Sequence, residues 1–289
     1  TLKNIFYVIG SPRSGSVLIY NSLCSSKIFN PSLPENHLVP YLVELFIKQI
    51  ERNQVKEKNL IFNSNNEIQI YFKECIQNFF RKVSKKYNTQ NLCFKSILFA
   101  TNIHIMNIIF PEVKFVMTVR DPRDIIASML QVSDKQIKSN ITPQYPRNMK
   151  VLSDFINKQY HNFFNHKNSE FFKNSVFIVK YEDFVFNHKE TLNEIMQKFD
   201  IDFSFKEIHD YWQNSLNLSN ESNSFFKSEL WGKPISNKKI GSYKDILSTA
   251  EIDDINSYCK EIINYFNYNN RIADALNVDL ELHVIDYEQ

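Results

Sequence analysis

Four short apolar runs, each followed by residues with helical spacing, restrict this chain to folds built on a parallel sheet. The strand-like runs, rich in β-branched or aromatic residues, are Asn4–Ile9, Asn91–Lys95, Val113–Val119 and Ser175–Lys180. Helix-period apolar residues follow in Val17–Leu23, Tyr41–Ile50, Ile103–Phe110, Ile125–Leu130, Val151–Phe164 and Thr191–Phe199. Alternating strands and helices predict an α/β fold, a parallel sheet flanked by helices on both faces. Without an internal repeat or linker in the sequence, we expect a single domain, 1–289.

Polar stretches between these elements predict long loops. They are Gln54–Glu67, Val132–Arg147 and Leu216–Lys239. Selectivity for a substrate is expected to reside in Gln54–Asn66, Val132–Arg147 and Leu216–Lys233, because loops carry most of the variable surface of a fold.

Composition excludes several classes of protein. A formal net charge of +2 and the lack of a long basic run argue against a nucleic-acid partner. No apolar run approaches the ~18–20 residues of a membrane span. The four cysteines are dispersed, neither they nor the seven histidines show metal-ligand spacing, and free thiols in a reducing compartment are expected. We therefore expect a cytoplasmic protein without a metal, although the chain begins at Thr1 and leaves open an anchor or signal upstream.

The first strand leads into a glycine-containing loop that resembles a P-loop. Gly10 and Gly15 have the P-loop spacing, but Ser16-Val17 stands where a Lys-[Ser/Thr] pair would hold a γ-phosphate and Mg²⁺. The backbone amides of Ser14, Gly15, Ser16 and Val17 face the start of a helix, where amides and the helix dipole bind anions. The loop is therefore predicted to bind a terminal monophosphate rather than a metal-bound triphosphate.

A second anion site is predicted after the third strand. Arg120 ends that strand, Asp121 can cap the next helix and Pro122 fits its first position. Ser128 follows within two turns. A long cation and a short hydroxyl can converge there on a second phosphate.

Together, the loop at Gly10–Ser16 and the Arg120/Ser128 pair resemble the paired phosphate sites of the sulfotransferases. The resemblance implies that the loop, with Arg13, holds the 5′-phosphosulfate of 3′-phosphoadenosine 5′-phosphosulfate (PAPS). It implies that Arg120 and Ser128 hold the 3′-phosphate, and that the product is adenosine 3′,5′-bisphosphate (PAP).

Further segments follow the same pattern. Val179–Phe184 is similar to a Tyr-Glu-Asp segment in that family, which assigns Tyr181 to the adenine ring; a buried aromatic at a strand end remains the alternative. Lys238–Lys244 resembles a Gly-x-Trp-Lys/Arg motif, with tyrosine in place of tryptophan, and assigns Lys239 and Gly241 to the 3′-phosphate. Lys233-Pro234 resembles a Lys-Pro that reaches the nucleotide.

Within the family, the likeness is greatest to tyrosylprotein sulfotransferases and related enzymes. It lies in Pro34–Pro40, Leu92–Ser96 and Phe110–Asp121. Cytosolic members of the family place a histidine, their general base, where this chain has Ile97. The resemblance therefore implies Glu35 as general base, with His37 as the second choice. Arg13 and Lys95 would stabilise the leaving oxygen, with Ser228 as an extra donor.

The same likeness fails at one point. The family's cysteine at the position of Cys93 pairs with another just before the catalytic glutamate, where this chain has Leu33-Pro34. The acceptor therefore stays open among peptide tyrosine, glycan, lipid and small hydroxylated or amine-bearing metabolites. Oligomeric state also stays open, a homodimer being one option.

Two other functions are compatible with these residues. A small-molecule kinase of the P-loop type would share the fold and the anion site, but should show Lys-[Ser/Thr] after Gly15. A non-catalytic protein that binds PAP or another nucleotide would keep the anion sites without a working base.

Overall fold

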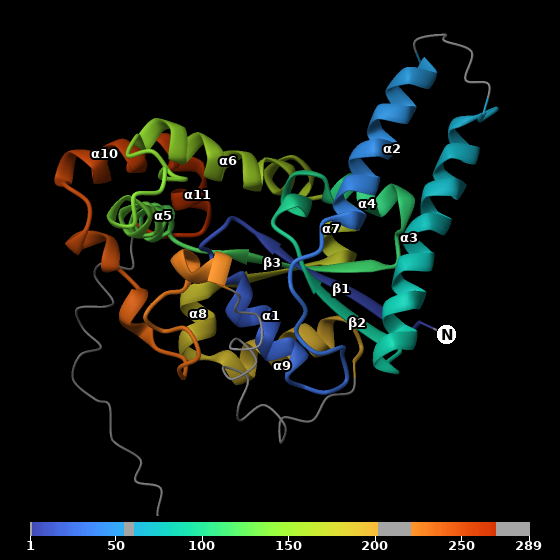
Figure 1. Cartoon of the computed structure of the whole chain (residues 1–289), viewed down its shortest axis with the longest axis horizontal. Helices are drawn as coiled ribbons and strands as arrows, with labels where there is room; N and C mark the ends of the chain where they lie inside the picture. The colour runs from blue at the N-terminus through green and yellow to red at the C-terminus, as the bar shows by residue number, and fades with distance from the viewer. Residues whose placement is uncertain (1, 55–60, 202–220, 270–289) are drawn as a thin grey trace, which may run out of the picture.

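The computed structural model describes residues 2–54, 61–201 and 221–269, arranged around a four-stranded parallel sheet (Figure 1). The strands are β1 (Asn4–Gly10), β2 (Asn91–Lys95), β3 (Val113–Val119) and β4 (Val176–Lys180). Their order in the sheet is β2-β1-β3-β4. Val8 of the inner strand β1 is in register with Lys95 on one side and Val116 on the other. All four strand ends that were predicted to carry chemistry therefore lie along one edge of the sheet.

Helices cover both faces of the sheet, as predicted (Figure 1). The bounds of the α-helices are α1 Ser16–Cys24, α2 Leu38–Gln54, α3 Asn65–Tyr87, α4 Ile103–Ile109, α5 Pro122–Lys138, α6 Met149–His166, α7 Glu170–Ser175, α8 Tyr181–Phe186, α9 His188–Lys198, α10 Thr249–Tyr258 and α11 Lys260–Tyr265. Short 3₁₀-helices are η1 Leu98–Thr101, η4 Glu221–Phe226, η5 Asn237–Lys239 and η6 Ser242–Asp245.

The side chains of β1 alternate between two hydrophobic clusters, one on each face of the sheet. Phe6 and Val8 pack with residues of α1 and α9, such as Ile19 and Ile195. Tyr7 packs on the opposite face with residues of α3, α4 and α6. Because successive strand side chains point to opposite faces, a strand covered on both sides must be apolar throughout, and β1 is buried over almost its whole length.

The structure corrects two expectations about local structure. Val132–Lys138 was predicted as loop but forms the last turns of α5, where Val132 and Gln136 are buried. Asn65–Glu67, predicted as the end of a loop, instead begin α3, a helix that was not predicted. With α2 it forms a hairpin that projects from the body (Figure 1). Residues 55–60 of the predicted loop Gln54–Glu67, and residues 216–220 of the stretch Leu216–Lys239, lie outside the described residues.

Candidate active site

The loop after β1 has the close-packed backbone expected of an anion site. Gly10 has φ 139°, and a Cβ there would lie 2.4 Å from Thr118 Oγ1 and 2.5 Å from its carbonyl oxygen. Gly15, with φ 91°, is the N-cap of α1 and supplies no side-chain cap. The first N–H groups of a helix lack intrahelical partners. Those at the start of α1 are therefore available to an anion.

Ser14 does not belong to this group of donors. Its N–H donates to the Ser11 carbonyl at 3.2 Å, and its hydroxyl contacts Ser11 O and Thr118 Oγ1. The residue is fully buried. Ser14 shapes the loop, and its amide is used within the loop rather than presented to a ligand.

A cavity lies between this loop, the start of α5 and the segment 226–242. Predicted nucleotide-binding residues that line it are Arg13, Gly15, Ser16, Val17, Arg120, Ser128, Tyr181, Lys233 and Lys239, together with Ser228. Leu230 and Trp231, which the sequence did not nominate, also line it. Both predicted anion sites therefore open into the same cavity.

Arg13 connects the two predicted anion sites directly. Its Nε donates to Ser128 Oγ at 3.0 Å, and its Nη1 donates to the Phe226 carbonyl at 2.9 Å. The backbone is left-handed at Arg13, with φ 70°, which is uncommon for a residue other than glycine. Burial, with a smaller effect of the Arg120 cation, lowers the pKa of Arg13. The Arg13 side chain is half-buried, and the partial loss of hydration strengthens its interaction with an anion.

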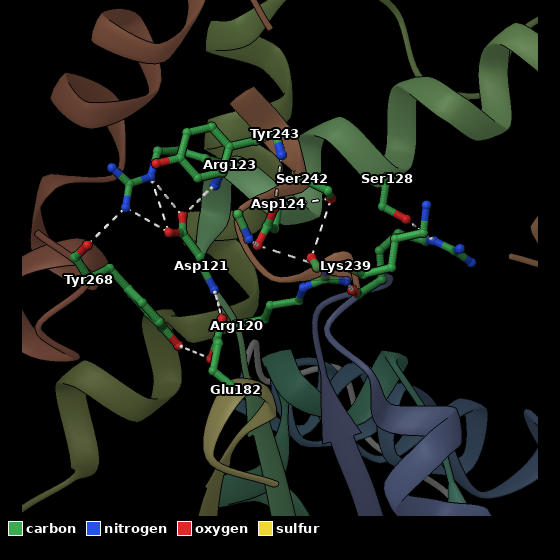
Figure 2. Close-up of polar contacts among 12 residues, drawn as sticks. Arg120, Asp121, Arg123, Asp124, Ser128, Glu182, Lys239, Ser242, Tyr243 and Tyr268 are labelled. Atoms are coloured by element: carbon green, nitrogen blue, oxygen red, sulfur yellow. Dashed lines mark hydrogen bonds and ion pairs between the residues drawn. The ribbon is translucent and has the colours of Figure 1, made fainter. Parts of the chain in front are cut away.

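Arg120 is buried at the end of β3, with 6% of its surface exposed. Its Nη1 donates to the Arg13 carbonyl at 3.1 Å and its Nη2 to the Lys239 carbonyl at 2.5 Å (Figure 2). Its guanidinium carbon lies 4.4 Å from the centre of the Tyr181 ring, a cation–π contact. The buried Nε has no hydrogen-bond partner within the described residues. One N–H of this cation therefore remains to be satisfied.

Tyr181 opens α8 and packs between the two anion sites. A Cβ on Gly15 would lie 2.4 Å from Tyr181 Cδ2, so only glycine allows this approach. Burial raises the pKa of the Tyr181 hydroxyl. The ring is therefore both a lining residue of the cavity and a buried packing residue.

Charged residues around the start of α5 form a buried network (Figure 2). As predicted, Asp121 caps α5, accepting from Arg123 N at 2.9 Å, with Pro122 in the first turn. Asp121 also pairs with the Arg123 guanidinium at 2.6 Å. Glu182 accepts from Asp121 N at 2.9 Å and from the Tyr268 hydroxyl at 3.3 Å. This network fixes the turn that carries Arg120, and sequence reasoning missed Glu182 and Tyr268 because their partners are distant in the chain.

Glu35 and Lys95 form a second cluster, outside the residues that line the cavity. Lys95 Nζ lies 2.5 Å from Glu35 Oε2, and the backbone N–H of Ile97 donates to Glu35 Oε1 at 2.8 Å. Both side chains are mostly buried, with exposed fractions of 14% and 20%. The structure thus joins two predicted catalytic residues that are far apart in the sequence. His37 is exposed, with its ring 5.9 Å from that of Tyr41.

Hydrogen bonds of Asn30 anchor the segment that carries Glu35 to strand β2. The Asn30 amide donates to the Cys93 carbonyl at 2.9 Å and accepts from Cys93 N at 2.8 Å. The Tyr20 hydroxyl accepts from Leu33 N at 2.7 Å. Pro31 and Pro34 stiffen the chain between these contacts and Glu35. These contacts with β2 therefore restrict the position of the Glu35 carboxylate.

We expect Asn30→Ala to lower the free energy of unfolding by about 2 kcal/mol, because two backbone groups of Cys93 lose their partner at a fully buried position. Urea titration measures this change. Asn78→Ala, on the exposed face of α3, is the matched control and should change stability little. Equal effects of the two substitutions would contradict the anchoring role.

Within residues 2–54, 61–201 and 221–269, no group of three or more His, Cys, Asp or Glu side chains could hold a metal ion. Over the same residues, no helix combines the length and apolar character needed to cross a bilayer. All four cysteines are free thiols.

Sequence comparison shows which family the chain belongs to. Residues 5–205 match the model described as the Sulfotransferase family, so this chain is a member of the sulfotransferase family. A comparison with curated proteins finds no match.

Solved structures agree in fold. The sulfotransferase domain from the curacin biosynthetic pathway is 21% identical with a TM-score of 0.58, covering 89% of this chain and 97% of that one. The sulfotransferase domain of the olefin synthase from Synechococcus PCC 7002 is 17% identical with a TM-score of 0.55, covering 89% and 95%. Mouse sulfotransferase SULT7A1, solved with PAP, is 11% identical with a TM-score of 0.52, covering 96% and 90%. The described structure therefore has the sulfotransferase fold.

Proposed function

We propose that this protein transfers the sulfuryl group of PAPS to a hydroxyl or amine acceptor and releases PAP. The observation that carries the proposal is that Arg13, Arg120 and Ser128 meet in one cavity, linked by the Arg13–Ser128 hydrogen bond. Two phosphates of a single small molecule can be bound at such a place. Family membership and the fold support sulfuryl transfer as the chemistry.

Unsatisfied groups in the cavity fit an adenosine bisphosphate. Arg120 Nε and Trp231 Nε1 are buried and have no hydrogen-bond partner within the described residues, and both residues line the cavity. A buried donor without a partner costs free energy, which a phosphate oxygen or another ligand acceptor would recover. The cavity also combines these donors with the apolar side chains of Leu18, Leu230 and Ile235, which suit the adenosine.

Each end of the nucleotide has its own group of residues. The amides of Gly15, Ser16 and Val17, with Arg13, would hold the 5′-phosphosulfate. The residues that would hold the 3′-phosphate are Arg120, Ser128, Lys233 and Lys239. Gly241, which the sequence also nominated, does not line the cavity, and its N–H donates to Asp124. Tyr181 would contact the adenine ring from the wall of the cavity.

Glu35 is the general base in this proposal. The acceptor oxygen forms a bond to sulfur as its proton passes to Glu35, and the bond from sulfur to the 5′-phosphate oxygen breaks. Charge then builds on the leaving oxygen, which Arg13 and Lys95 stabilise with Ser228 as a further donor. Lys95 also orients the Glu35 carboxylate, because Lys95 Nζ lies 2.5 Å from Glu35 Oε2. No metal is needed for these steps.

The acceptor class rests on resemblance alone. The segments Pro34–Pro40 and Leu92–Ser96 make peptide tyrosine one candidate, beside glycans, lipids and small metabolites. Incubation with radiolabelled PAPS against a panel of these acceptors, with boiled protein as control, would identify the class that accepts label.

Binding of PAP is the most direct test of the proposed function. We expect PAP at 100 times its Kd to raise the free energy of unfolding by about 2.7 kcal/mol, while ATP with Mg²⁺ has a much smaller effect. Thermal denaturation with each ligand measures the difference. Stabilisation by ATP with Mg²⁺ but not by PAP would overturn the proposal and favour a kinase; PAP binding without turnover on any acceptor would favour a non-catalytic protein.

A further inference from the structure

Asp124 lies beside the nucleotide cavity without being one of its lining residues. It is the third residue of α5, and its side chain is 1% exposed. Its Oδ2 accepts from Gly241 N at 2.8 Å, and its Oδ1 accepts from Tyr243 N at 3.0 Å and from Ser242 Oγ at 3.3 Å (Figure 2). A single buried carboxylate thus accepts hydrogen bonds from three donors of a segment more than 100 residues further along the chain.

The same carboxylate faces Arg120 on its other side. Arg120 Nη2 lies 3.9 Å from Asp124 Oδ2 and donates to the carbonyl of Lys239 at 2.5 Å. The segment Lys239–Tyr243, which we call the strap, is therefore held twice, by Arg120 at its start and by Asp124 further along. Figure 2 shows Asp124 between Arg120 and Tyr243.

The strap supplies groups to the cavity. Lys239 and Ser242 line it. The backbone turns at Gly241, where φ is 73°. Because Asp124 accepts from the N–H groups on both sides of Ser242, it fixes the direction in which the strap leaves this turn. Asp124 therefore acts together with the Arg120–Lys239 hydrogen bond in placing Lys239 relative to Arg120.

Burying the Asp124 carboxylate costs free energy unless the charge has hydrogen-bonding or charged partners. Burial raises the pKa of Asp124, whereas Arg120 and the Gly241 and Tyr243 amides lower it. A buried charge is retained in a fold only where charged or hydrogen-bonding partners compensate for lost hydration. Here the compensating partners are the arginine and the strap that the proposed function assigns to the 3′-phosphate.

We propose that Asp124 is a positioning residue for the 3′-phosphate of the nucleotide. It holds Arg120 and the strap in a fixed mutual geometry and does not itself contact the ligand. This inference rests on the proposed function. It predicts that Asp124 matters to ligands that carry a 3′-phosphate and little to ligands that lack one.

Removing the Asp124 charge tests the proposal, because electrostatics and geometry predict opposite changes in the affinity for PAP. By Coulomb attraction alone, Asp124→Asn should strengthen phosphate binding, because a negative charge near Arg120 is lost. If geometry dominates, the near-isosteric asparagine cannot accept from both backbone amides, and the affinity for PAP falls by about 10- to 100-fold. The affinity for 5′-AMP, which lacks the 3′-phosphate, should change by less than about threefold.

Calorimetric titration of the whole chain with PAP and with 5′-AMP measures both affinities. Asp154→Asn, on an exposed part of α6, is the matched control and should leave both unchanged. An equal loss for PAP and 5′-AMP would mean a general structural role and would overturn the inference, as would unchanged or tighter PAP binding. Wild-type protein that does not prefer PAP over 5′-AMP would instead overturn the proposed function.

A measurement on the wild-type protein covers the case in which Asp124→Asn does not fold. Hydrogen exchange of the Gly241 and Tyr243 amides reports the two bonds to Asp124. We expect PAP to slow this exchange by tenfold or more and 5′-AMP to leave it unchanged. Equal protection by the two ligands, or none by PAP, would overturn the inference.

Discussion

Glu35→Gln is expected to reduce turnover by about 10²- to 10⁴-fold while PAP binds as in the wild type, because the substitution removes the proposed general base and leaves the proposed nucleotide cavity intact. Glutamine has nearly the same shape, and its Oε1 can still accept from Ile97 N, as Glu35 Oε1 does at 2.8 Å. It cannot take the acceptor's proton. Transfer of label from PAPS measures turnover, and calorimetry measures the Kd for PAP.

Two further substitutions sharpen this test. Glu51→Gln, on the exposed face of α2, controls for the loss of a carboxylate and should retain wild-type turnover. His37→Gln tests the second candidate base, whose exposure on the surface argues against it. Loss of turnover on changing His37 but not Glu35 would reverse the assignment.

Gly15→Ala is expected to have the second-largest effect, lowering the free energy of unfolding by about 2–4 kcal/mol and weakening PAP binding by about 100-fold or more. The added Cβ would lie 2.4 Å from Tyr181 Cδ2, and the Tyr181 ring is itself stacked on Arg120. Displacing the ring would therefore disturb both proposed phosphate sites at once. Urea unfolding and titration with PAP measure the two effects.

Gly241→Ala separates steric clash from backbone strain. Both glycines have left-handed backbones, but a Cβ on Gly241 would meet no atom within 4 Å. We expect it to cost only the left-handed strain, about 1–2 kcal/mol. If Gly15→Ala costs no more than Gly241→Ala, then contact between Gly15 and Tyr181 is not what requires glycine in the loop.

Sequence patterns predicted the sheet well because buried parallel strands are nearly continuous apolar runs. Asn91–Lys95 and Val113–Val119 have the predicted bounds. The end of α5 was missed because Ser133, Asp134 and Lys135 give its last turns a polar composition that resembles a loop. In α3, by contrast, Ile68, Phe72, Ile76 and Phe80 recur every four residues, a pattern that could have revealed the helix.

Much of the candidate site was predictable because its residues occupy short motifs at strand ends. Arg120 and Ser128 were identified in this way, and they line one cavity with Arg13. Asp124 lies within the same motif but could not be singled out, since its partners Gly241 and Tyr243 are 117 and 119 residues away. Local patterns carry no information on such pairings. Glu35 and Lys95 were each assigned by resemblance, and their pairing was not predicted.

The amide of Asn30 has one more consequence, for how copies of this protein behave in a crowded solution. Strand β2 is an edge of the four-stranded sheet, and an uncovered edge is a template on which another chain can add a strand. Here the outward N–H and C=O of Cys93 are already bonded to Asn30, and Phe29 bridges to Asn91. A foreign strand would have to displace both contacts, so the segment that presents Glu35 also protects the β2 edge of the sheet from pairing with another chain.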